Sequence, residues 1–494
     1  MNTKAIIYNK VKKVGTTLCL LLLATCFFTS CNDWLDVSPK SQIKEEDHFS
    51  REGGYKDQLT GIYTALTTQS MYGLNMGIGF AEVLSHTYNI DPNGNWRYAN
   101  DFNYTESLSE STISTIWSST YSAITNCNIL IRNIEKADPN IFTDYNYHVY
   151  HGEALGLRAF LHFDLMRLFA CAPSMNGTAP GVPYVTEYST EVVGQKSVNE
   201  TMQFIVNDLM KAREELAYDT LTATGEYPNK DFDFKRNNFN YFACTLTLAK
   251  AYLWMGDTQN ALRYAKELVD WTESDIWDHC FTWVHYTNMQ QTARNQLDTS
   301  FSTEHIFQLR INDWEDIGNY YFMSEGGANA LTPAEATVED IYEISMGLGG
   351  DWRYTKGFEQ DGEKRYSAKF WYVAGSSYNN IYPLLRMSEP FYIAAECYKN
   401  TNPKEAIRLL QVVRENRGLS ADNFPLSENL TAEQIQNEIY KEYRKEFIGE
   451  HGELFFYYKR LNAAEIKGSA LRPGKGVYVL PIPSNDQEFG GYSN

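Results

Sequence analysis

The chain has 494 residues, of which 43% are hydrophobic and 21% charged, and it carries a formal net charge of −19. These values are typical of a large globular protein and exclude a disordered, collagen-like or multi-span membrane chain. The acidity argues against a nucleic-acid partner, because the phosphates would be repelled. Of the 71 aromatic residues, 45 are tyrosine or tryptophan, whose rings combine an apolar face with a polar group and suit a wet binding surface.

The N-terminus has the form of a secretory signal. Four lysines within the first 13 residues precede an apolar stretch at 18–28, about half as long as the ~20 residues of a membrane-spanning helix. Thr29 and Ser30 stand directly before Cys31, which resembles the lipobox of bacterial lipoproteins, although Phe28 stands where leucine is usual. We expect removal of residues 1–30 and lipidation of Cys31, with ordinary secretion as the alternative.

The N-terminal signal also bears on the charge, the export and the anchoring of the mature chain. Loss of the four lysines brings the net charge to −23 over 464 residues. The acidic residues Asp33 and Asp36 after the cysteine are similar to the surface-export signal of Bacteroidetes lipoproteins. A lipid-bearing Cys31 anchors the protein to a membrane without spanning it.

Helical periodicity dominates the first half of the remaining chain. Apolar residues three or four apart predict helices at about 55–72, 113–135, 152–170 and 197–217. Ser197 and Glu200 have the spacing of a capping box at the start of the fourth helix.

Residues 244–269 resemble a tetratricopeptide repeat. Small Ala249 and Ala261 allow two antiparallel helices to approach closely, and Gly256 is placed to end the first helix. Ala394 and Ala406 repeat the same twelve-residue spacing. We therefore expect a mainly α fold in which tetratricopeptide-like helix pairs form a scaffold at about 50–270 and 380–460.

Two stretches break the helical pattern and are rich in aromatic residues. Residues 84–107 contain Pro, Gly and Asn in the proportion of a loop, and residues 275–375 carry few helical signals. A third segment, 436–462, alternates acidic and basic residues around aromatic ones, and we expect it to be a core helix with a solvated charged face.

No catalytic, metal or cofactor motif is evident. His148 and His151 lie three apart but lack a third ligand near in sequence. The DPNGN segment at 91–95 is similar to a calcium loop, but Trp96 and Phe102 stand where that loop needs Gly and Glu. Five cysteines other than Cys31 follow the signal, none in a close pair, so neither a disulfide framework nor a zinc site is indicated. We expect no cofactor and no bound metal.

Several segments in order along the chain resemble one family, the SusD/RagB lipoproteins of Bacteroidetes. These segments are SCNDWLD at the lipidation site, WSSTYSAITNCN (117–128), GEALGLRAFLHFDLMRLFA (152–170), VNETMQFIVNDLMKA (198–212), the helix pair at 244–269, YPLLRMSEPFYIAAE (382–396), VRENRGL (413–419), EIYKEYRKEFIGEHGELFFYYKRLN (438–462) and LPIP (480–483). Ala170 departs from the usual glycine of the family.

The resemblance implies a single SusD-like domain over residues 31–494, with a helical scaffold and loops that carry the ligand site. It implies a binding protein and not an enzyme, located at the outer membrane. It also implies delivery of a nutrient oligomer to a SusC-like, TonB-dependent barrel transporter. A glycan is the expected ligand, and a peptide, as in the RagB branch, is the alternative. A helical glycoside hydrolase and a protein-binding scaffold remain the other readings.

The candidate ligand-binding residues come from the two irregular stretches. Arg and Asn bind sugar hydroxyls, while aromatic rings stack on the apolar faces of pyranose rings. The first stretch supplies Trp96, Arg97, Tyr98 and Asn100, and the second supplies Trp283, Tyr286, Trp314, Tyr320 and Tyr321.

Overall fold

The computed structural model describes residues 44–219, 235–274 and 281–494. The predicted signal peptide and Cys31 lie outside these residues. The chain separates into two compact units, Met1–Arg51 and Glu52–Asn494. The short helix α2 (Glu45–His48) belongs to the first unit, and every element named below belongs to the second. The single domain expected over 31–494 remains a prediction.

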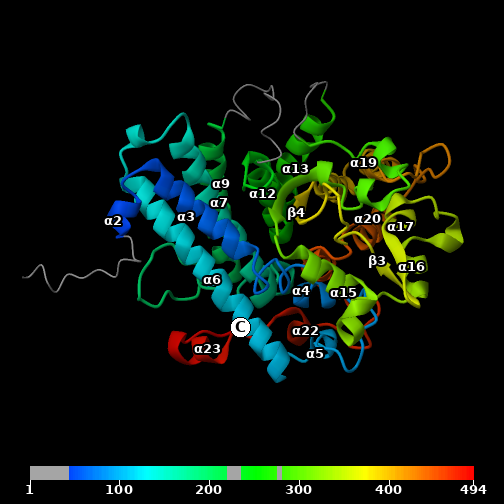
Figure 1. Ribbon diagram of the computed structural model, residues 1–494, viewed down its shortest axis with the longest axis horizontal. Helices are drawn as coiled ribbons and strands as arrows, with labels where there is room; N and C mark the ends of the chain where they lie inside the picture. The colour runs from blue at the N-terminus through cyan, green and yellow to red at the C-terminus, as the bar shows by residue number, and fades with distance from the viewer. Residues whose placement is uncertain (1–43, 220–234, 275–280) are drawn as a thin grey trace, which may run out of the picture. The chain divides into compact units, whose positions relative to one another are not determined.

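The second unit is built on a row of helices in which each packs against the next, and this confirms the predicted mainly α fold class. The row runs through α3 (Glu52–Leu66), α6 (Ser107–Lys136), α7 (Asn146–Phe169), α9 (Val198–Leu216), α12 (Tyr241–Met255), α13 (Thr258–Thr272), α18 (Ser388–Tyr398), α19 (Pro403–Glu415) and α20 (Ala432–Glu446). Figure 1 shows this succession from the blue and cyan helices through the green ones to the orange ones.

The structure confirms the helix ends that the sequence predicts at Ser197 and Gly256. Ser197 and Glu200 form the predicted capping box, each side chain bonding the other residue's backbone N–H. Gly256 ends α12 in a left-handed conformation, with φ of 79°. Such a conformation favours glycine, which lacks the Cβ that would clash.

The two tetratricopeptide-like pairs stack on one another. Ala249 and Ala261 are completely buried where α12 meets α13, and Ala394 and Ala406 are buried where α18 meets α19. Since α13 also packs on α18, the two pairs form one continuous layer although more than a hundred residues separate them in sequence.

The irregular stretch between α13 and α18 forms small elements. Strand β1 (His305–Arg310) pairs antiparallel with β4 (Ile381–Arg386), and β2 (Phe358–Asp361) pairs with β3 (Lys364–Ser367). The short helices here are α14 (Tyr286–Met289), α15 (Tyr320–Phe322), α16 (Glu335–Ile341) and α17 (Trp352–Thr355). Elsewhere short helices occur at α4 (Phe80–Val83), α5 (Arg97–Asn100), α8 (Pro173–Asn176), α22 (Lys475–Tyr478) and α23 (Ser484–Gly490), and α21 spans Glu453–Arg460.

A buried ionic network links this stretch to the C-terminal helices. The prediction of a solvated charged face at 436–462 is therefore wrong around Glu446. Glu446 at the end of α20 is 1% exposed and accepts bonds from Arg353 (2.8 Å), Arg386 (3.2 Å) and Arg417 (2.6 Å). Arg417 also makes two bonds to Glu304, at 2.8 and 2.6 Å. Burial opposes the ionised form of Glu446, but the three guanidinium groups hold its pKa well below the usual 4.5.

Among the described residues, no helix combines the length and the apolar character that crossing a membrane requires.

Candidate functional site

The structure brings one part of each irregular stretch together. The turn before α5 lies against the segment 318–329, which contains α15. Asn95 donates its backbone N–H to Asn329 Oδ1 at 2.8 Å, and Trp96 donates its indole N–H to the Asn329 carbonyl at 3.2 Å. We call this junction, residues 94–100 with 318–329, the loop junction.

Gly94 allows the close approach of the two backbones. A Cβ atom at this position would lie 2.1 Å from the carbonyl oxygen of Ala328. No real Cβ tolerates that contact, so only glycine fits here.

Trp96 supports the loop junction from beneath. It is 7% exposed, and its ring lies 5.6 Å from that of Tyr321 at an interplanar angle of 55°. Its outer edge also touches Gly79, where a Cβ would come within 2.9 Å of the indole. A side chain so enclosed positions its neighbours and leaves almost no face for a ligand.

Tyr320 and Tyr321 are half-buried and form the accessible aromatic part of the loop junction. Their rings are 5.0 Å apart and nearly perpendicular, at 89°. Asn329 donates to the Tyr320 hydroxyl at 3.1 Å. Burial raises the pKa of Tyr321, and Tyr320 adds to the shift, so the Tyr321 hydroxyl stays protonated and able to donate at neutral pH.

The predicted binding residues with polar side chains lie on α5. The Arg97 guanidinium stacks 4.2 Å above the Tyr98 ring and donates to the Gly94 carbonyl at 2.7 Å. Asn100 donates to Asp101 at 3.2 Å. Arg97, Tyr98 and Asn100 are all half-buried, so they keep polar surface that can reach a ligand.

The other three predicted residues lie apart from the loop junction. Trp314 is 2% exposed, and its indole donates to the Phe370 carbonyl at 2.7 Å, so it belongs to the core. Trp283 is half-buried against Phe391, with ring centroids 5.2 Å apart. Tyr286 is 58% exposed on α14, and its ring lies 6.0 Å from that of Trp352. We therefore leave all three out of the proposed site.

Asn329 is the residue that the sequence did not reveal. It links the turn before α5 with Tyr320 through both its backbone and its side chain. It stands in the segment SEGGAN, which reads only as a turn. Its role follows from the meeting of segments more than 200 residues apart, which no local pattern signals.

A buried carboxylate holds the start of the 84–107 stretch. Glu82 on α4 is 1% exposed and accepts N–H bonds from Gly449 at 2.9 Å and Gly452 at 3.3 Å, in the turn between α20 and α21. The hydroxyl of Tyr88 bonds the same carboxylate at 3.2 Å. Burial raises the pKa of Glu82 to about 8, although these hydrogen bonds act in the opposite direction.

Comparison with known proteins agrees with this fold. Residues 33–230 match a family described as starch-binding and associating with the outer membrane, and residues 354–488 match the SusD family. The chain belongs to the SusD/RagB family. The family consists of binding proteins associated with the outer membrane, and the resemblance seen in the sequence is confirmed.

Individual relatives of this SusD-like protein are distant. It is 24% identical to SusD-like protein P25 of Formosa agariphila over 257 residues, which is 51% of this chain and 45%, about half, of that relative. A SusD superfamily protein of Bacteroides thetaiotaomicron has the same fold, with a TM-score of 0.69 at 22% identity, covering 89% of this chain and 98% of that one. A laminarin-binding SusD-like protein matches with a TM-score of 0.63 at 18% identity, covering 89% and 97%.

Proposed function

We propose that this SusD-like protein binds a glycan oligomer at the loop junction and passes it to a SusC-like, TonB-dependent barrel transporter. The observation that carries the proposal is the contact between two distant segments, in which the turn before α5 supports the half-buried tyrosines of α15. Tyr320 and Tyr321 are held by Asn329 and Trp96, and Arg97 and Asn100 on the neighbouring helix α5 keep partly exposed polar groups.

The arrangement suits a carbohydrate. Tyrosine rings bind the apolar faces of a pyranose, and their hydroxyls, together with Asn and Arg, bind its hydroxyl groups. Because a hydrogen bond from Asn329 holds Tyr320 and ring contacts hold Tyr321 before a ligand arrives, little side-chain entropy is lost on binding. The support comes from positioned binding groups, and the proposal includes no chemical step.

Calorimetry with a panel of glycan and peptide oligomers tests the ligand class. Oligosaccharides derived from laminarin are a suitable first probe, because one SusD-like protein of the same fold is described as laminarin-binding. Saturable binding of a glycan, with none of the peptides binding, supports the proposal. Binding of peptides alone would place the protein with the RagB-like alternative. Sustained release of cleavage products would indicate a hydrolase, and the absence of any ligand would favour a protein-binding scaffold.

We further propose that Cys31 carries the lipid that holds the mature chain at the outer membrane. Cells grown with labelled palmitate should label the wild type and not the Cys31→Ala variant. Equal labelling of both proteins would rule out this anchor.

The transporter partnership has its own test. A barrel protein should co-purify with the tagged full chain from detergent-solubilised outer membranes. Purification of the SusD-like protein alone, under conditions that preserve other outer-membrane complexes, would contradict the partnership without affecting the glycan proposal.

A further inference from the structure

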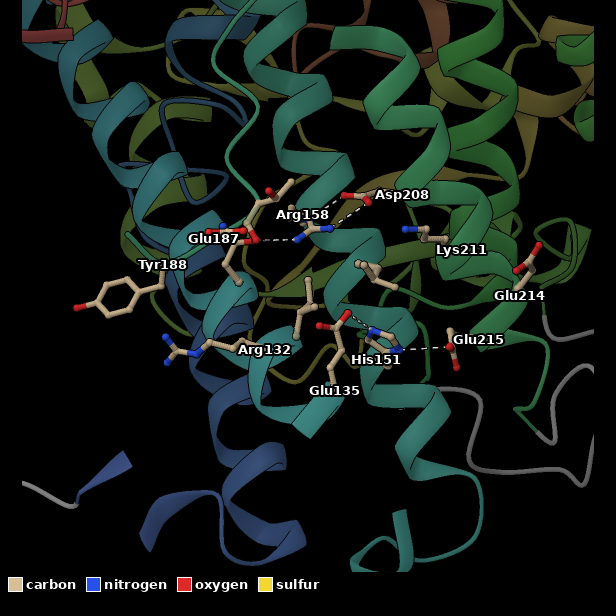
Figure 2. A pocket seen from close by; sticks show the side chains of 14 residues that line it. Arg132, Glu135, His151, Arg158, Glu187, Tyr188, Asp208, Lys211, Glu214 and Glu215 are labelled. Atoms are coloured by element: carbon tan, nitrogen blue, oxygen red, sulfur yellow. Dashed lines mark hydrogen bonds and ion pairs between the residues drawn. The ribbon is translucent and has the colours of Figure 1, made fainter. Parts of the chain in front are cut away.

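A groove with a volume of about 580 Å³ runs along α7 between α6 and α9, on the helical scaffold. Helix α7 forms its floor, α6 and α9 form its walls, and the segment 186–188 borders it (Figure 2). None of its lining residues belongs to the loop junction. Its size is that of pockets that bind small ligands in other proteins.

A buried ion pair between Arg158 and Asp208 lies at the floor of the groove. Arg158 on α7 makes two bonds to Asp208 on α9, at 2.7 and 3.0 Å, and a third to Asn128 on α6 at 3.0 Å. Both charged side chains are less than a tenth exposed. The pair joins the three helices, and its two charges cancel.

The remaining lining holds more acidic than basic side chains, and His151 on α7 lies between two of the carboxylates, 3.2 Å from Glu215 and 3.8 Å from Glu135. Four carboxylates border the groove beside that pair, namely Glu135, Glu187, Glu214 and Glu215, whereas Arg132 and Lys211 are its two other permanent cations. The carboxylates come from both walls and from the bordering segment, so they surround the space (Figure 2). A concave site lined by one excess sign of charge attracts ligands of the opposite sign.

Two exposed tyrosines lie near the groove, Tyr188 in its lining and Tyr218 next to it through His148. Tyr188 is 58% exposed, with the Arg132 guanidinium 5.6 Å from its centroid. Tyr218 is 49% exposed and stacks on His148 at 3.9 Å and 11°. His148 in turn bonds the lining carboxylate Glu215 at 2.6 Å. Exposed tyrosines beside a polar groove provide flat faces for sugar rings and for cations.

We infer that this groove is a second binding site, which takes an oligosaccharide of amino sugars. A protonated amino group would be bound by the surrounding carboxylates, hydroxyl groups would donate to the same carboxylates, and the sugar rings would stack on Tyr188 or Tyr218. A glycan made of uronic acids would be repelled by the same lining. This site is distinct from the loop junction in both its elements and its charge.

Two glutamates allow a test without disturbing the helices. Glu187 and Glu214 are exposed at the rim, so a Glu187→Gln, Glu214→Gln double variant removes charge without burying any polar group. Glu363→Gln, on the exposed turn between β2 and β3, is a control that removes one exposed charge outside the groove. Tyr321→Ala reports separately on the loop junction.

The probe is a glucosamine trimer, titrated by calorimetry below neutral pH, where its amines are protonated, and compared with its N-acetylated counterpart. We expect the trimer to bind at least about tenfold more tightly than the acetylated form, because hydrogen bonds to charged groups are the stronger ones. The double variant should lose about tenfold in affinity for the trimer, while Glu363→Gln retains wild-type affinity.

Three results with the sugars would overturn the inference, and a fourth comes from a peptide control. The first three are no binding of the glucosamine trimer, equal affinity for the acetylated form, and loss of trimer binding in Tyr321→Ala but not in the double variant. Trilysine is the remaining control, and binding of trilysine as tightly as the sugar would refute the saccharide assignment. Because the loop-junction proposal is tested with neutral glycans, either proposal can fail while the other stands.

Discussion

Mutation of Trp96 tests whether this residue supports the binding site or contacts the ligand. The sequence makes it a candidate binding residue, whereas the structure encloses it beneath Tyr321 with its indole bonded to Asn329. Replacement of a buried aromatic residue by alanine costs about 3–5 kcal/mol in unfolding free energy. Since Trp96 is 7% exposed, we expect Trp96→Ala to lose ~3 kcal/mol.

The Trp96→Phe variant separates the contribution of the aromatic ring to stability from that of the indole N–H. Phenylalanine keeps an aromatic ring against Tyr321 but lacks the indole N–H, which leaves the Asn329 carbonyl without this donor. A lost hydrogen bond of this kind costs about 1 kcal/mol, and the smaller ring adds a cavity term, so we expect a loss of ~1–2 kcal/mol. The order wild type, Phe, Ala should appear in the unfolding free energies.

Urea unfolding followed by far-ultraviolet circular dichroism is the suitable assay, because the chain is mainly helical and the signal does not depend on tryptophan. Tyr286→Ala is the matched control, since its ring is 58% exposed and its removal should change stability by less than about 0.5 kcal/mol. A Trp96→Ala variant that unfolds like the wild type but loses glycan affinity would contradict the supporting role, because Trp96 would then act as a stacking surface.

Three further predictions concern the contacts that hold the site in place. Gly94→Ala should destabilise the protein by about 1–3 kcal/mol by forcing the backbones of the loop junction apart, and unchanged urea unfolding would contradict the close approach to Ala328. Glu446→Gln should cost about 3–5 kcal/mol, since it leaves buried guanidinium groups without their central carboxylate; a loss below about 1 kcal/mol would show that the network is dispensable. The pKa of Glu82 is raised from 4.5 to about 8, so the folded state holds a proton that the unfolded state releases, and the contribution of this group to stability falls as pH rises from 4.5 to 8. Glu82→Gln should flatten this dependence in urea midpoints measured across that range, and a pH profile parallel to the wild type would be the contrary result.

The sequence was sufficient to predict the scaffold because helical periodicity and helix ends are local signals. The capping box at Ser197, the left-handed end at Gly256 and the buried Ala249 and Ala261 all follow from neighbouring residues. They require only that apolar and small positions recur on one face of a helix.

The ionic network and the loop junction could not be predicted, for a common physical reason. The residues that flank Glu446 in sequence are charged, as on a solvated helix face. Its burial depends on arginines that lie 29 to 93 residues away. Asn329 depends in the same way on a turn 233 residues earlier. Aromatic content identified the correct stretches, but it did not separate Trp314, which fills the core, from Tyr321, which is half-buried at the junction.

Glycan binding at the loop junction is tested most directly by titrating wild type, Tyr321→Phe and Tyr321→Ala with one neutral oligosaccharide, such as a laminarin-derived oligomer. Phenylalanine keeps the stacking face, and alanine removes it while leaving Trp96 in place. We predict that Tyr321→Phe stays within about threefold of wild type and that Tyr321→Ala loses about tenfold or more, which corresponds to ~1.4 kcal/mol. Wild-type affinity in Tyr321→Ala, with unchanged stability, would contradict the placement of the glycan site at this junction.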